Sequence, residues 1–228
     1  MSDVERHFDA IAPTYDSWKK RNWYYYQNLK AFFQRRIPAG KCVFDFGCGT
    51  GEVLAELKPR IGIGFDGSTE MIKHASAKFS KNTNLYFTDA RSDSRFHDEP
   101  FDYIVCSDVI EHLEDVDGAL RFMRQVASQK SIGIITMVTA LWEPVLMVLE
   151  KLHMKMPEGP HHRISFRILQ KKLQDAGFVI EERGTRLLVP TAAMPFANTI
   201  NKYFYKIPLV RKLGLIGYVI VRPAGVSQ

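Results

Sequence analysis

Apolar residues occur with two different spacings along this chain. Short, nearly continuous apolar runs predict buried strands at residues 41–46, 61–66, 84–89, 101–108 and 131–139. Between them, apolar residues recur every three or four positions, as in helices that lay one face on a sheet, at 52–57, 68–79 and 116–128. Strands that alternate with helices over short connections predict an α/β fold with a doubly wound sheet.

The two ends of the chain differ from this middle part. Residues 3–36 are expected to be mostly helical, and Pro38 to Gly40 break that pattern. A helix over 164–178, with Gly177 near its end, precedes two last strands at 179–190 and 213–223. No full crossover helix is evident between these strands, so we expect an antiparallel pair with a surface insertion.

Composition is that of an ordinary globular protein. The 228 residues, 46% hydrophobic and 25% charged, suit a single domain, 1–228. The net charge of +6 is spread along the chain, which suits either a solvated basic face or attraction to nucleic acid, anionic lipid or an acidic substrate. Three cysteines without metal-ligand spacing, and no secretory leader, predict a cytoplasmic protein with reduced thiols.

One apolar stretch is long enough to raise the question of a membrane span. Residues 132–149 are strongly apolar, but Thr136, Glu143 and Pro144 interrupt them. A buried strand followed by a helix is the better interpretation.

The segment "VFDFGCGTG", residues 43–51, carries the strongest signal for a ligand. It is the first strand-to-helix turn, the usual binding place in a doubly wound sheet, and Gly47, Gly49 and Gly51 would let a ligand approach the backbone. Glycines alone do not separate a dinucleotide from another adenosine cofactor. Asp45 and Glu52 disfavour a pyrophosphate and favour the ammonium and sulfonium of S-adenosylmethionine.

Further acids follow at the ends of the next strands. Asp66 comes 66 − 45 = 21 residues after Asp45, the place of an acid that accepts from ribose hydroxyls. Met71 would pack on adenine or simply in the core. Asp89 and the N–H of Ala90 would bind adenine, or Asp89 would be an ordinary exposed strand end.

Together these motifs resemble those of the class I S-adenosylmethionine-dependent methyltransferases. The likeness extends over "VFDFGCGTG", "GFDGSTEMI", "FTDA" and "FDYIVCSDVIEHL" in the family's order. It implies a seven-stranded sheet of order 3-2-1-4-5-7-6 with the last strand antiparallel, helices on both faces and a helical cap. The cofactor-binding residues it implies are Tyr15, Asp45, Gly47, Cys48, Gly49, Gly51, Asp66, Gly67, Met71, Asp89, Ala90 and Ser107.

Two more segments resemble the quinone-biosynthesis and small-molecule members of that family. "HFDAIAPTYD" is similar to their entry segment, which implies that residues 1–38 form a helical lid and that Tyr15 covers the cofactor; Tyr15 could also simply pack between helices. "EGPHHRISFRILQKKLQDAGFVI" is similar to the segment before their sixth strand. A small-molecule acceptor methylated on oxygen or carbon is therefore expected, without nucleic acid.

The acceptor's proton needs a base in some methyl transfers, and imidazole is suited to that role. The candidates are His112, His161 and His162. Alternatively, Asp108, Glu111 and His112 resemble the metal-binding spacing of some relatives and would suit Mg²⁺, though Asp108 stands where those relatives have Glu.

Residues 141–165 and 190–212 are expected to form cap segments. The apolar helix predicted at 141–156 and the basic, aromatic stretch 196–218 would roof a hydrophobic pocket, touch a membrane surface, or only pack together. A monomer or homodimer fits equally well. Two other functions stay open: an NAD-dependent oxidoreductase, and a non-catalytic S-adenosylmethionine-binding protein.

Overall fold

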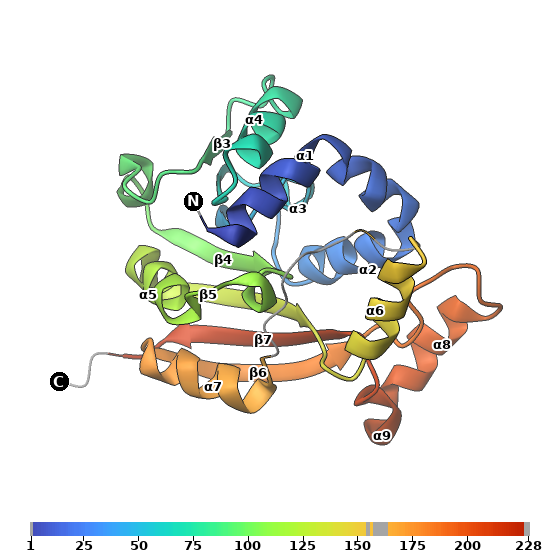
Figure 1. The fold of residues 1–228 in the computed structure, drawn as a ribbon. Helices are drawn as coiled ribbons and strands as arrows, with labels where there is room; N and C mark the ends of the chain where they lie inside the picture. The colour runs from blue at the N-terminus through green and yellow to red at the C-terminus, as the bar shows by residue number, and fades with distance from the viewer. Residues whose placement is uncertain (1, 154–155, 157–163, 226–228) are drawn as a thin grey trace.

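A computed structural model describes residues 2–153, 156 and 164–225 of the chain. The described residues form a seven-stranded sheet in the order β3-β2-β1-β4-β5-β7-β6 (Figure 1). The strands are β1 (Cys42–Phe46), β2 (Ile61–Phe65), β3 (Leu85–Thr88), β4 (Phe101–Ser107), β5 (Ala127–Val138), β6 (Phe178–Arg186) and β7 (Ile216–Pro223).

The first five strands run parallel, and β7 lies antiparallel between β5 and β6. Asp45 of β1 lies in register with Gly64 of β2 and Val105 of β4, so the carboxyl ends of the three central strands meet at one edge. The predicted fold class, strand order and antiparallel last strand are confirmed.

The described helices connect and cover these strands. They are α1 (Asp3–Arg21), α2 (Trp23–Gln34), α3 (Glu52–Glu56), α4 (Thr69–Lys78), α5 (Val116–Val126), α6 (Glu143–Lys151), α7 (Phe166–Asp175), α8 (Ala197–Tyr203) and α9 (Pro208–Arg211). Three single turns of 3-10 helix complete them: η1 (Ser94–His97), η2 (Ile110–His112) and η3 (Phe204–Lys206).

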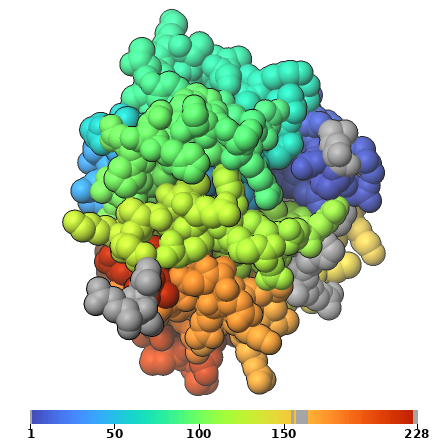
Figure 2. Space-filling model, turned by 90° about the vertical axis from the view of Figure 1, so that its left-hand side faces the viewer, coloured from blue at the N-terminus to red at the C-terminus, as the bar shows by residue number. Residues whose placement is uncertain are grey.

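Each face of the sheet has its own apolar core. On one face, buried residues of α2 and α3 pack with β1, β5 and β7, including Phe32, Phe33 and Leu54. On the other face, α5 and α7 pack through residues such as Leu120 and Leu169. Figure 2 shows η1, α5 and α7 stacked along the left-hand side of Figure 1. Burial on both faces explains why the central strands are apolar throughout.

Local sequence signals set several helix ends. The Ser68 side chain accepts a hydrogen bond from the N–H of Met71 and so caps α4, as predicted. Gly177 follows α7 with φ +81°, a conformation that glycine adopts without strain. In α5 the buried positions Val116, Ala119 and Met123 recur at helical spacing.

Several boundaries differ from the prediction; β5, for example, begins at Ala127 rather than at residue 131, and β7 begins at Ile216 rather than at residue 213. Helix α6 begins at Glu143 and ends at Lys151, shorter than the predicted 141–156, and His153 just beyond it has a positive φ of 53°. Strand β6 ends at Arg186 rather than continuing to residue 190, because Leu187 turns away with φ 61°.

Residues beyond the strand ends close the carboxyl edge of the sheet. Figure 1 shows α1, α2 and α6 grouped around the arrowheads of β4 and β5. Within the described ranges, no helix has both the length and the apolar content needed to cross a bilayer.

Candidate functional site

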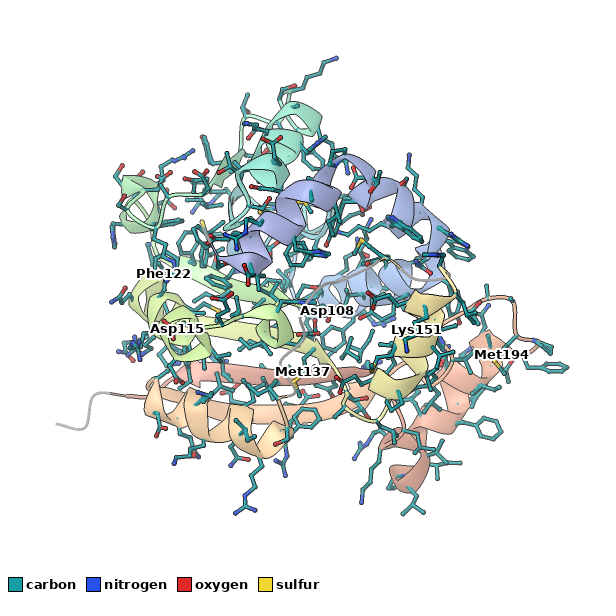
Figure 3. All side chains as sticks on the ribbon, in the orientation of Figure 1. Asp108, Asp115, Phe122, Met137, Lys151 and Met194 are labelled. Atoms are coloured by element: carbon teal, nitrogen blue, oxygen red, sulfur yellow. The ribbon has the colours of Figure 1, made fainter. Side chains whose placement is uncertain are left out.

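A cavity of about 800 Å³ lies at the carboxyl edge of β1, β2 and β4. Helices α1 and α2, the glycine turn after β1, the segment after β4 and helix α6 all line it. In Figure 3, Asp108 marks this place, just beyond the end of β4. The cavity joins an end of mixed charge, beside β1 and β2, to an end rich in apolar side chains.

The glycine turn brings the backbone to the wall of the cavity. Gly47 has φ +75°, and a Cβ there would come within 2.3 Å of the Val109 side chain. Gly49 has φ +53°, and the Tyr15 ring lies over it, 3.3 Å from where a Cβ would be. Larger side chains at these positions would strain the turn and fill space that a ligand could use.

Asp45 is a buried carboxylate in the wall of this cavity. It is only 1% exposed, and neither oxygen has a hydrogen-bond partner within the described part of the chain. Burial raises the pKa of Asp45 to about 7, against the opposing effect of Lys19. Such a group is suited to receive a cationic ligand.

Lys19 brings a positive charge to the same cavity from α1. It is nearly buried, and its ammonium lies 4.5 Å from the centre of the Tyr15 ring. Burial lowers its pKa, while the charges of Glu52 and Asp16 act to raise it. The cavity therefore has an anionic and a cationic wall in the same region.

Asp66 ends β2 and holds the turn in place. Its two oxygens accept from the N–H groups of Gly49, at 2.8 Å, and Ser68, at 2.9 Å. Burial raises the pKa of Asp66, although these two hydrogen bonds act to lower it. Each oxygen keeps a second lone pair with which to accept from a ligand hydroxyl.

Most of the predicted cofactor-binding residues meet at this cavity. Those that line it are Tyr15, Asp45, Gly47, Cys48, Gly49, Asp66, Gly67, Met71, Asp89 and Ser107. Gly51 is the N-cap of α3 and packs against Phe87, outside the lining. The Ala90 N–H is also outside it and donates to the Thr88 hydroxyl at 3.2 Å.

Two carboxylates of α1 hold this helix over the charged end of the cavity. Asp9 accepts from the Ser68 hydroxyl at 2.5 Å and from the N–H of Glu70 at 3.1 Å. Asp16 accepts from the Thr50 hydroxyl at 2.6 Å and pairs with Lys78 at 2.7 Å. Lys78 also pairs with Glu52 at 2.8 Å. Helix α1 is therefore fastened to the glycine turn and to α4, and Lys78 connects both helices to α3.

The segment after β4 places three more titratable groups in the lining: Asp108, Glu111 and His112. Asp108 accepts from the hydroxyls of Tyr25, at 2.6 Å, and Thr136, at 2.7 Å. Glu111 accepts from the N–H of Val138 at 2.9 Å.

These groups are not arranged as metal ligands. In the residues that the structure describes, no three His, Cys, Asp or Glu side chains are gathered so that they could hold a metal ion. The spacing of Asp108, Glu111 and His112 along the chain therefore does not produce a ligand cluster here.

The three histidines predicted as candidate bases differ in where they lie. His112 is buried, lines the cavity and meets the Phe8 ring edge-on, with ring centres 5.4 Å apart. His161 and His162 lie outside the described residues.

Two residues of the cavity lining, Lys19 and Tyr25, were not predicted from the sequence. Lys19 follows Tyr15 by four residues on one helix, so the shared face was a usable signal. Tyr25 had no such signal, because its contact with Asp108 joins residues 83 positions apart. Burial and the Asp108 charge raise the pKa of Tyr25 well above its usual range, so Tyr25 is a neutral hydrogen-bond donor.

Comparison with known proteins places this site in a family. A family model described as a methyltransferase domain matches residues 17–183, which include both the glycine turn and the segment after β4. The chain belongs to this methyltransferase family. It is accordingly an S-adenosylmethionine-dependent methyltransferase, and S-adenosylmethionine is its cofactor. An NAD-dependent oxidoreductase is thereby set aside.

Relatives in the same family differ in what they act on. The methyltransferase is 27% identical to the ubiquinone biosynthesis O-methyltransferase of Rhodopseudomonas palustris (strain BisB5), over 70% of this chain and 69% of that one. It is 36% identical to an Arabidopsis thaliana tRNA (carboxymethyluridine(34)-5-O)-methyltransferase, but over only 33% of this chain and 18% of that one.

Solved structures agree in fold. A Haloferax volcanii methyltransferase, in complex with the Trm112 methyltransferase activator, has a TM-score of 0.70 at 19% identity, covering 96% of this chain and 98% of that one. The magnesium protoporphyrin IX methyltransferase of Synechocystis PCC 6803, solved with bound SAH, has a TM-score of 0.62 at 17% identity, covering 97% and 100%. At these identities the likeness concerns the fold.

Proposed function

We propose that this methyltransferase transfers a methyl group to oxygen or carbon of a small, hydrophobic acceptor. The observation that carries the proposal is that one continuous cavity has both a charged end, suited to the cofactor, and an apolar end, suited to such an acceptor. The similarity to the ubiquinone biosynthesis O-methyltransferase, over two thirds of both chains, supports this acceptor class.

The charged end fits S-adenosylmethionine in charge as well as in shape. At neutral pH this cofactor has an ammonium, a carboxylate and a sulfonium, and its sulfonium supplies the methyl group in an activated form. Asp45 would face the ammonium, Lys19 the carboxylate and Asp66 the ribose hydroxyls. Two carboxylates and one lysine sum to one negative charge, which balances the net positive charge of the cofactor.

The apolar end is formed by side chains from distant parts of the chain. Phe8 of α1, Leu146 and Leu149 of α6, Val138 of β5 and Leu215 before β7 line it. Asp108 and His112, which line the same cavity, could bind one reacting hydroxyl, but the rest of a polar acceptor would lose hydrogen bonds to water against these apolar side chains without replacing them. A hydrophobic ring or tail would instead gain from burial.

His112 is our candidate for the general base. It lies in the same cavity, directly after β4, and is protected from bulk water. Its role would be to accept the proton of an acceptor hydroxyl while methyl transfer proceeds. Asp108, which accepts from Tyr25 and Thr136, would orient the acceptor rather than take its proton.

The three cofactor-binding roles can be separated by the choice of ligand. We expect Lys19→Met to weaken binding of S-adenosylhomocysteine about tenfold or more, because the ligand's carboxylate loses its cation. Binding of methylthioadenosine, which lacks the amino-acid part, should not change. Asp66→Ala should weaken both ligands, since both have the ribose. Isothermal titration measures all four affinities.

A different pattern would contradict the assignment. If Lys19→Met weakened methylthioadenosine as much as S-adenosylhomocysteine, Lys19 would serve the structure of α1 and not the carboxylate. Lys20→Met is the matched control, because Lys20 is the next residue on the same helix, is exposed and lies outside the lining.

The acceptor class and the base can be tested together. With labelled S-adenosylmethionine, we expect a hexyl-substituted catechol to be methylated faster than dihydroxybenzoate, because the apolar end binds the hexyl chain. His112→Asn should lower kcat about 100-fold near neutral pH, the usual size of a base's contribution, and remove the rising limb of the pH–rate profile.

S-adenosylhomocysteine affinity serves as the control for His112→Asn and should stay within about twofold, since the variant is not expected to alter the charged end. Methylation of tRNA in preference to both catechols would contradict the proposed acceptor class. An unchanged kcat in His112→Asn would exclude His112 as the base.

A further inference from the structure

Helix α6 is apolar on two faces. Leu146 and Leu149 line the cavity on its inner side. On the outer side Val145, Val148 and Leu152 form a second stripe at helical spacing, with Val148 56% and Leu152 61% exposed. A surface helix usually presents polar residues to water, so this outer stripe is suited to an apolar environment.

The segment from Met194 to Leu213 continues the apolar surface. Its exposed large apolar residues are Met194, Phe196, Tyr203, Phe204, Ile207, Leu209 and Leu213. Phe196 and Leu209 are 78% and 77% exposed, more than any other large apolar residue of the described chain. Phe196 also has a positive φ of 61°, which is unusual for a bulky residue.

The two segments are joined into one surface. The indole N–H of Trp142, just before α6, donates to the carbonyl of Leu213 at 2.7 Å, and the Thr139 hydroxyl donates to the carbonyl of Gly214 at 2.8 Å. Figure 1 shows α6, α8 and α9 together at the lower right, and Figure 3 labels Lys151 and Met194 on this side. We call α6 together with residues 194–213 the cap surface.

Charge on the 194–213 part of this surface has one sign, whereas α6 has both signs, with Glu143, Glu150 and Lys151. Glu182 is the last acidic residue of the sequence, and the 46 residues after it contain seven Arg or Lys. Four of these seven lie in residues 194–213: Lys202, Lys206, Arg211 and Lys212, all exposed. Lys202 and Lys206 lie 5.1 Å and 5.8 Å from the centre of the exposed Tyr203 ring.

We propose that the cap surface binds an anionic lipid bilayer. Exposed aromatic and aliphatic side chains would enter the boundary between headgroups and acyl chains, while the lysines would remain at the level of the phosphates. The exposed aliphatic side chains, such as Val148, Leu152 and Leu209, argue against RNA, which presents phosphates and aromatic bases but no aliphatic surface. Residues 194–213 contain four basic residues and no acidic one, and this charge, with the lysines beside Tyr203, argues for lipid phosphate over a neutral protein partner.

Sedimentation with lipid vesicles tests this directly. We expect the full chain to bind vesicles of phosphatidylcholine mixed with phosphatidylglycerol, and to bind pure phosphatidylcholine much more weakly. The pair Lys202→Gln and Lys206→Gln should lower the partition coefficient about 25-fold, since each lysine near an anionic surface contributes about fivefold. Leu209→Ser should lower it about tenfold, because its side chain would no longer enter the bilayer.

A matched charge control is available on the other side of the molecule. Lys130→Gln with Lys171→Gln removes the same charge from exposed positions on β5 and α7, outside the cap surface. This pair should leave vesicle binding within about twofold of the unaltered protein. Equal weakening by both pairs would mean unspecific attraction by the net charge and would overturn the proposal.

Two further outcomes would also overturn it. One is failure to sediment with anionic vesicles. The other is a dimer in sedimentation velocity that Leu209→Ser converts to a monomer, which would assign the cap surface to a second copy of the chain. S-adenosylhomocysteine titration, run on the same samples, shows whether the cofactor site is intact, so failure of the surface and of the proposed function are distinguished.

Discussion

At the scale of single residues, Asp45 sets the properties of the site. The folded protein keeps a carboxylate at the wall of a cavity without giving it a hydrogen bond from the described residues, and burial raises its pKa to about 7. Near neutral pH this group is easily protonated while the protein is alone. A cationic ligand would favour the charged form and would release a proton as it binds.

Asp45→Asn should therefore stabilise the protein while harming cofactor binding. A carboxyl with a raised folded pKa contributes stability below its unfolded pKa and loses it as pH rises through about 7. Near pH 8 we expect the variant to be about 2–4 kcal/mol more stable than the unaltered protein, and near pH 4 about equally stable. Urea unfolding at the two pH values measures this difference.

The same variant should bind S-adenosylhomocysteine about tenfold or more weakly near pH 8, since the ammonium loses its carboxylate. If the variant were less stable than the unaltered protein at the higher pH, Asp45 would be making stabilising contacts in the folded state. Our interpretation of Asp45 as a carboxylate kept without partners for a cationic ligand would then be wrong.

At the scale of elements, α1 is fastened over the site by charges rather than by a large apolar face. Asp9 and Asp16 provide its contacts with α4 and the glycine turn, and Lys78 joins α4 to both α1 and α3. Burial acts to raise the pKa of Asp16, but the hydrogen bonds from Lys78 and Thr50 outweigh it, and the pKa is lowered. The cover over the charged end is thus held by a small ionic network.

Lys78→Met should loosen this cover. We expect faster amide hydrogen exchange in residues 3–21 and an S-adenosylhomocysteine dissociation rate raised about fivefold, because Asp16 loses its ion pair and keeps only the Thr50 hydroxyl, while Glu52 keeps Lys30. Hydrogen exchange by mass spectrometry and stopped-flow measure the two effects.

Lys73→Met provides the comparison, since Lys73 lies on the same helix and, among the described residues, forms its ion pair within that helix, with Glu70 at 2.7 Å. Equal exchange rates in the two variants would show that Lys78 does not hold α1.

At the scale of the whole molecule, the sequence predicted the sheet much better than the parts that cover it. Apolar runs predicted the strands themselves, because buried parallel strands have strong local signatures, and the right strand order followed from the family that the motifs at their ends resemble. The end of α6, the positive φ of Leu187 and the contact between Tyr25 and Asp108 were missed. These depend on contacts between residues far apart in the chain, which no local pattern records.

The cavity is covered by two unconnected pieces of chain. Helix α1, from the beginning of the sequence, lies over the charged end and reaches the apolar end only through Phe8, while α6 and the segment around Pro190 close the apolar end. Neither piece has to move for the other to open. Cofactor exchange and acceptor exchange can then occur in either order, so a spent cofactor could leave while a poorly water-soluble product is still bound, and turnover would follow random-order kinetics.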